Sequence, residues 1–126
     1  MKSFKSYMCE NIQGRIFPSW KVAAEVESHH HTHDDLIDGD VLQRIQAYDY
    51  YILTNIPLSD LSLDEWEVDE GLVDEYVSKL QNGEEYPPIV IDSISYGVPT
   101  IIDGIHRANA LSITGNDTVK AYVTKE

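Results

Sequence analysis

Residues 101–111 read IIDGIHRANAL, and this short stretch decides more about the fold than any other part of the chain. The two isoleucines before Asp103 are typical of the end of a buried strand, and the residues from Ile105 onward favour a helix that stops near Gly115. Gly104 permits a tight turn between them, because glycine adopts backbone conformations that a Cβ atom disfavours. The stretch therefore predicts a strand, a turn and a helix in immediate succession.

The same turn has the features of an anion site. The start of a helix presents N–H groups without partners and the positive end of the helix dipole. Arg107 adds a planar fork that suits phosphate oxygens, and His106 adds another donor. Asp103, just before the turn, could orient a magnesium ion or accept a proton from a nucleophile. We therefore take Gly104, His106 and Arg107 as candidate phosphate-binding residues and Asp103 as the candidate catalytic residue.

A purely structural interpretation of these residues is also open. In that interpretation Asp103 caps the helix, Arg107 reaches a surface carboxylate, and the ring of His106 is hydrogen-bonded in the core. The residues of the turn alone do not decide between the two interpretations.

The rest of the chain predicts alternating helices and strands. The clearest helix covers residues 68–80, where apolar side chains form one stripe and Asp69 and Glu70 favour the positive end of the helix dipole. Further helices are predicted at residues 20–27, 40–48 and 105–113, and strands at 50–56, 88–93, 98–103 and 119–123. The strands at 88–93 and 98–103 are joined by a short turn at Tyr96 and Gly97, which predicts a hairpin.

These elements indicate an α+β protein with a small mixed sheet packed against helices. We predict one domain at residues 50–126, with an N-terminal extension at residues 1–49 that is partly helical and packs on the domain. The length of 126 residues fits a single domain, and the 42% hydrophobic content is enough for a core.

The chain is strongly acidic, with 22 acidic and 9 basic residues and a formal net charge of −13. Such a charge argues against general nucleic-acid binding, which relies on clustered Lys and Arg. The single cysteine, Cys9, cannot form an intramolecular disulfide, and no stretch is apolar enough for a membrane span. We therefore expect a cytoplasmic protein.

Five segments occur in an order that resembles one known group of proteins. They are YYILTNIPLSDL at residues 50–61, VDEYVSKL at 73–80, PPIVID at 87–92, the IIDGIHR turn, and GNDTVKAYV at 115–123. This order, with the DG-x-HR signature, resembles the ParB/sulfiredoxin-like superfamily over about residues 50–123. The resemblance implies a fold that handles nucleotides.

Three branches of the superfamily differ at the turn. In sulfiredoxins the turn reads GGCHR, and the position of the catalytic cysteine is Ile105 here, so the resemblance excludes sulfinate repair. In chromosome-partitioning ParB proteins the turn is closer to GERR and a separate DNA-binding module follows, for which we expect no room before Glu126. Members that resemble free serine kinases carry a DG-x-HR turn much like this one.

The kinase-like resemblance implies ATP or another nucleotide, Mg²⁺, and transfer of a phosphoryl group to a small acceptor, or nucleotide hydrolysis. It places Asp103 near the transferred phosphate, with Gly104, His106 and Arg107 on the phosphates. Such kinases use a second carboxylate near the first strand, for which Asp60 and Asp64 are the nearby candidates. Some relatives have been called nucleases, but the net charge argues against that third function unless a metal and a local basic path are present.

A histidine cluster precedes the acidic part of the chain. If the segment is extended, His29, His31 and His33 share one face and form a candidate metal site, because imidazoles suit zinc, nickel or iron. The other interpretation is a solvated loop, since a metal site needs ligands fixed by surrounding hydrogen bonds.

Residues 34–75 contain thirteen acidic residues and one base, Arg44. The simple interpretation is a solvated surface that keeps the protein soluble. The alternative is a docking surface for a basic protein, with Asp64, Glu65 and Glu67 around Trp66 as candidate partner-binding residues, since interfaces favour Trp. A non-enzymatic interaction or inhibitor protein, including one that mimics the charge of DNA, is therefore the second function we carry forward.

Overall fold

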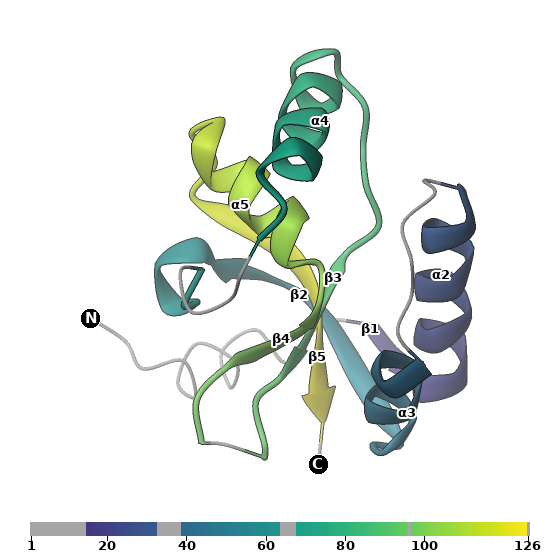
Figure 1. Cartoon of the computed structure of the whole chain (residues 1–126). Helices are drawn as coiled ribbons and strands as arrows, with labels where there is room; N and C mark the ends of the chain where they lie inside the picture. Colours follow the sequence, from purple (N-terminus) through teal and green to yellow (C-terminus); the bar gives the residue numbers. More distant parts are fainter. Residues whose placement is uncertain (1–14, 33–38, 64–67, 96, 126) are drawn as a thin grey trace.

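Strand β5 (Thr118–Lys125) lies in the middle of a five-stranded sheet of order β1-β2-β5-β3-β4 (Figure 1). The structure is a computed structural model, and it describes residues 15–32, 39–63, 68–95 and 97–125. β5 pairs along its whole length with the antiparallel β2 (Tyr50–Pro57) and runs parallel to β3 (Ile89–Asp92). The sheet is therefore mixed, as the sequence predicted.

The predicted hairpin is confirmed. β3 pairs antiparallel with β4 (Thr100–Asp103), with Asp92 opposite Thr100 and Val90 opposite Asp103. The second strand of the hairpin is shorter than predicted, because pairing begins at Thr100 and not at Val98. β4 ends at Asp103, so the turn at Gly104 follows the hairpin directly.

Side chains alternate between the two faces of the sheet and build a core on each. Val119, Ala121 and Val123 of β5 pack with α5 (Ile105–Ile113), whereas Tyr122 faces the other side and packs with α2 (Ser19–Thr32) and α3 (Gly39–Gln46). This is the period of two expected of a strand buried on both faces. The fold class is therefore α+β, as predicted, with helices on both sides of the sheet.

The first strand was not predicted. β1 (Arg15–Pro18) pairs antiparallel with β2, and it places Phe17 opposite Tyr51. Four residues that end in proline give a weak strand signal, and proline is tolerated here because β1 is an edge strand. Part of the N-terminal extension is thus a strand of the same sheet.

The helix after β1 is longer than predicted. α2 continues to Thr32, so the expectation of an extended or looped segment from His29 to Thr32 is wrong. Val22, Val26 and His29 lie three and four residues apart and are all buried, which explains why the helix continues.

α4 (Glu70–Gln81) confirms the clearest predicted helix and is capped by Asp69, whose side chain accepts a hydrogen bond from the N–H of Leu72. It follows the short 3-10 helix η1 (Leu58–Asp60) in the chain and packs on α5 rather than on the sheet (Figure 1). Val73, Tyr76 and Ala110 form the buried part of that contact. The starts of both helices lie close together as a result.

No helix in the described ranges is long and apolar enough to cross a membrane.

Candidate functional site

The predicted strand, turn and helix are present with the expected boundaries. Gly104 connects β4 to α5 and has a left-handed backbone conformation, with φ 106° and ψ 21°. A Cβ atom at this position would lie 2.4 Å from Cγ2 of Ile89. Gly104 is therefore required twice, by its backbone angle and by the close approach of β3.

Gly104, and not Asp103, is the N-cap residue of α5, and no side chain caps the helix. The structural interpretation in which Asp103 caps the helix is therefore wrong. The first N–H groups of α5 are left without a capping side chain, and such groups are suited to an anion.

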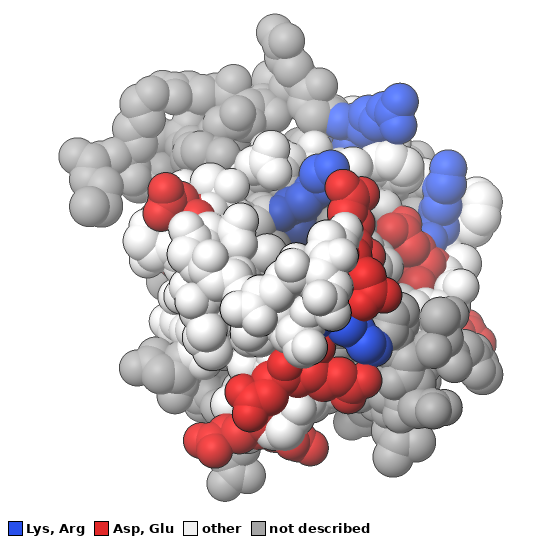
Figure 2. Space-filling model, turned by 90° about the horizontal axis from the view of Figure 1, so that it is seen from above, with Lys and Arg blue, Asp and Glu red and all other residues white. Residues whose placement is uncertain are grey.

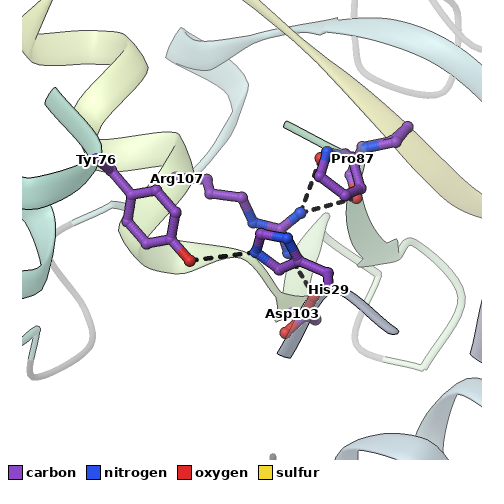
Figure 3. Close-up of polar contacts among 6 residues, drawn as sticks. His29, Tyr76, Pro87, Asp103 and Arg107 are labelled. Carbon is purple, nitrogen blue, oxygen red and sulfur yellow. Dashed lines mark hydrogen bonds and ion pairs between the residues drawn. The ribbon is translucent and has the colours of Figure 1, made fainter. Parts of the chain in front are cut away.

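Arg107 is buried, with 4% of its surface exposed, and its guanidinium joins three parts of the fold (Figure 3). Nη1 donates to the carbonyl oxygens of Pro87 at 2.8 Å and Pro88 at 3.2 Å, and Nη2 donates to a carboxylate oxygen of Asp103. The guanidinium thus holds the end of β4 and the segment before β3 against α5. At least three of the five N–H donors of the guanidinium are therefore used inside the protein, which limits what it can offer a phosphate.

His106 is held by the start of the neighbouring helix. The backbone N–H of Asp69 donates to Nε2 of His106 at 3.1 Å. Because Nε2 accepts, a neutral ring carries its proton on Nδ1, which is then a donor. The ring is partly exposed, so it differs from the core histidine of the structural interpretation.

His29 lies in a buried aromatic cluster and is 5% exposed. Its Nε2 is 3.2 Å from the hydroxyl of Tyr76 (Figure 3). Its ring lies near those of Tyr76 and Tyr86, at centroid distances of 6.3 and 5.8 Å. The described residues contain no group of three or more His, Cys, Asp or Glu side chains arranged to hold a metal ion. His33 lies outside the described residues, so the metal site of His29, His31 and His33 stays a prediction.

The candidate docking residues Asp64, Glu65, Trp66 and Glu67 also lie outside the described residues. Of the two candidates for a second carboxylate, Asp60 is the last residue of η1 and Asp64 is outside the described part. Sequence reasoning missed the contribution of Asp69, although an Asp three residues before an apolar stripe is a helix-cap signal. It also missed the carbonyl groups of Pro87 and Pro88, for which a sequence carries no signal.

A second buried carboxylate, Asp92, lies at the end of β3 and serves the hairpin. It accepts hydrogen bonds from the N–H groups of Ile94 and Ser95 at 2.9 and 3.0 Å and from the hydroxyl of Tyr48 at 3.1 Å. Burial is the largest single influence and raises the pKa of Asp92, but the hydrogen bonds together outweigh it and lower the pKa. Ile94 and Ser95 follow Asp92 closely in the chain, so Asp92 stabilises the turn after β3, and its bond to Tyr48 ties that turn to the segment after α3.

Comparison with known proteins identifies the fold. No protein-family model and no curated protein matches the sequence. Among solved structures, the chain is similar to sulfiredoxin from Arabidopsis thaliana, with a TM-score of 0.50 and 19% identity over 60% of this chain and 86% of that one. It is also similar to C-terminally truncated SbnI from Staphylococcus aureus, with a TM-score of 0.50 and 23% identity over 59% of this chain and 31% of that one.

The chain therefore has the ParB/sulfiredoxin-like fold, and the prediction of that fold from the order of its segments is confirmed.

Proposed function

We propose that this protein binds a nucleoside di- or triphosphate with its phosphates at the start of α5. We further propose that, with Mg²⁺, it hydrolyses the nucleotide or transfers a phosphoryl group to a small acceptor. The observation that carries the proposal is the start of α5, where Gly104 is the N-cap residue and no capping side chain bonds to the first N–H groups. A cytoplasmic location belongs to the same proposal.

The donors around this cap fit a phosphate. The N–H groups at the start of α5 point along the helix axis, and the proton on Nδ1 of His106 provides a further donor. The α4 start lies beside them, because the N–H of Asp69 bonds to the same ring. The start of α5 and the imidazole of His106 therefore offer donors at one place, whereas the start of α4 is already capped by the carboxylate of Asp69.

Arg107 and Asp103 fit this site in a different way from the one the sequence suggested. In the structure the guanidinium positions the turn, and Asp103 is its partner. Asp103 is the residue that would either orient Mg²⁺ or take the proton of an acceptor hydroxyl. When bound, Mg²⁺ neutralises charge on the phosphate that is transferred.

Calorimetric titration with ATP, ADP and CTP in the presence of Mg²⁺ tests the proposal. We expect saturable binding of at least one nucleotide, followed by release of phosphate or phosphorylation of an added acceptor. Absence of binding with all three would overturn the proposal.

A matched pair of variants locates the site. His106→Glu keeps an acceptor for the N–H of Asp69 and suits the helix dipole, but it places a negative charge where the phosphate binds. We expect it to weaken binding at least about tenfold. Ser112→Glu adds the same charge at the exposed far end of α5, and we expect a change of less than about twofold. Equal effects of the two variants on nucleotide affinity would show that the nucleotide does not bind at the turn.

Two observations favour a second function: the guanidinium of Arg107 bonds to groups of the protein itself, and one surface is acidic. α4 and the segment after it carry five exposed acidic residues, Glu70, Asp74, Glu75, Glu84 and Glu85. Figure 2 looks down on the end of the molecule where α4 and α5 lie and shows acidic side chains gathered beside a largely uncharged area. We propose that, if no nucleotide binds, this face docks a basic protein.

Neutralising Glu70, Asp74 and Glu75 together tests the second function. We expect binding partners recovered from cell extract with the native protein to be lost with this variant at low salt. Recovery of the same partners would count against docking through α4.

A further inference from the structure

A cavity of about 230 Å³ is lined by Arg107 and by none of residues 103–106 of the proposed phosphate site. Its walls come from the end of α4, residues 84–88, the middle of α5 and the start of β5. The lining is largely apolar and includes Leu80, Ile89, Leu111 and Val119. A mostly apolar hollow with a few polar groups is typical of a site for a small molecule.

Charges of both signs lie among the residues that line the cavity. Glu84 and Glu85 come from the segment before β3, and Lys120 comes from β5, and all three side chains are exposed. The positive charge of Arg107, which also lines the cavity, is balanced by Asp103. The charges left to interact with a ligand are therefore two carboxylates and one ammonium.

One wall of the cavity is fixed by aromatic packing. The ring of Tyr86 packs edge-on against Tyr76 and His29, at centroid distances of 4.8 and 5.8 Å. Pro87 and Pro88 follow it, and their carbonyl groups are bonded to Arg107. This side of the cavity is therefore held in place before a ligand arrives, which reduces the cost of ordering on binding.

We propose that this cavity binds a small zwitterion with an apolar body, namely a free α-amino acid with a branched aliphatic or aromatic side chain. The side chain lies among Leu80, Ile89 and Leu111. The ammonium group lies toward Glu84 and Glu85, and the carboxylate lies toward Lys120. The cavity is large enough for such a body, since a water molecule occupies only about 30 Å³ of liquid.

A zwitterion matches the presence of both carboxylates and an ammonium group among the lining residues, and a singly charged ligand does not. An apolar acid would meet two carboxylates at the mouth, and an apolar amine would leave Lys120 without a role in binding. The proposal is independent of the nucleotide, because none of the cap residues Asp103, Gly104 and His106 lines the cavity.

Titration of ¹⁵N-labelled protein with three ligands of the same shape tests the charge requirement. The ligands are L-leucine, 4-methylpentanoate, which lacks the ammonium group, and 3-methylbutylamine, which lacks the carboxylate. L-Phenylalanine is titrated beside them as a second amino acid. We expect saturable shifts at Leu80, Ile89, Leu111 and Val119 with leucine or L-phenylalanine, and binding roughly tenfold weaker with each singly charged analogue. Equal binding of all three ligands, no binding by the amino acids, or shifts elsewhere would overturn the proposal.

Substitution of the charged residues gives an independent test. Lys120→Met keeps the apolar stem and removes the charge, and we expect it to weaken leucine binding roughly tenfold. Glu84→Gln combined with Glu85→Gln should do the same. Lys21→Met makes the Lys120 change on α2, away from the cavity, and should leave the affinity unaltered. Because all four residues are exposed, these variants should fold, and unchanged affinity in the first two would overturn the proposal.

Discussion

The backbone N–H of Asp69 donates a hydrogen bond to Nε2 of His106 at 3.1 Å, across 37 residues of sequence. Asp69 caps α4 and His106 lies in the first turn of α5, so this bond holds the two helix starts together. Because Nε2 is the acceptor, the proton of the neutral His106 ring is on Nδ1. One histidine thereby positions the helix starts and orients a donor at the proposed phosphate site.

Loss of this bond should be measurable in stability. His106→Ala removes the acceptor of a partly exposed N–H, and we expect the free energy of unfolding to fall by about 1 kcal/mol. His106→Gln offers an amide oxygen in its place and should recover part of the loss. Urea unfolding followed by circular dichroism checks both values. A loss near zero for His106→Ala would show that the bond contributes nothing to the packing of α4 on α5.

Gly104→Ala should be far more destabilising than a change to alanine at another glycine with a similar backbone angle. The new Cβ would lie 2.4 Å from Ile89, in a backbone conformation with φ 106°. Strain and overpacking together predict a loss of about 3 kcal/mol in the free energy of unfolding.

Gly115→Ala is the matched control for that change. Gly115 has φ 87°, but no atom lies within 4 Å of the added Cβ. Only the backbone strain remains, so we expect a loss of about 1 kcal/mol. Similar losses at Gly104 and Gly115 in urea unfolding would contradict the close approach of β3 to the turn.

Removal of the Arg107 side chain should lower the free energy of unfolding, whether or not Arg107 contributes to binding. Arg107→Ala leaves Asp103 buried without its partner and frees the carbonyl groups of Pro87 and Pro88, and we expect a loss of about 3–5 kcal/mol. Arg107→Met combined with Asp103→Asn removes both charges and should lose less than Arg107→Ala alone.

Chemical unfolding of the single and double variants measures this difference. A loss below about 1 kcal/mol for Arg107→Ala would show that the guanidinium does not hold the fold together. The expected loss also explains why His106→Glu, and not Arg107→Ala, is the better probe of nucleotide binding.

The order of elements could be predicted because its signals are local. Apolar periodicity defined α4, and the glycine between an apolar strand and a helix defined the turn at Gly104. β1 could not be predicted, because four residues that end in Pro18 acquire strand pairing only from β2. The continuation of α2 through His29 was missed for a similar reason, since its burial depends on Tyr76, which is distant in sequence.

The candidate site was predicted in position but not in its internal bonds. Asp103, Gly104, His106 and Arg107 all lie at the start of α5, as the sequence indicated. The sequence could not show that Arg107 would bond to carbonyl groups some twenty residues earlier in the chain. Backbone acceptors have no sequence signature, so the distinction between a phosphate contact and an internal clamp requires the structure.

Asp92 should make stability depend on pH in the acidic range. Its pKa is lowered in the folded state, because hydrogen bonds from Ser95, Ile94 and Tyr48 outweigh the opposite effect of burial. A carboxylate with a lowered pKa stabilises the fold fully above its unfolded pKa of about 3.9 and loses that contribution as the pH falls through the folded pKa. Asp92→Asn cannot titrate and should cost about 1–2 kcal/mol at neutral pH, because Tyr48 loses a charged acceptor.

The stability difference between the native protein and Asp92→Asn is the quantity to measure. It should be largest at about pH 7 and should shrink as the pH is lowered to about 3 and below, because both proteins then carry an uncharged side chain at residue 92. Asp49→Asn, at an exposed position between α3 and β2, controls for the general loss of one negative charge. A difference that stays constant between the two pH values, or that grows toward acid, would contradict the assignment of a lowered pKa to Asp92.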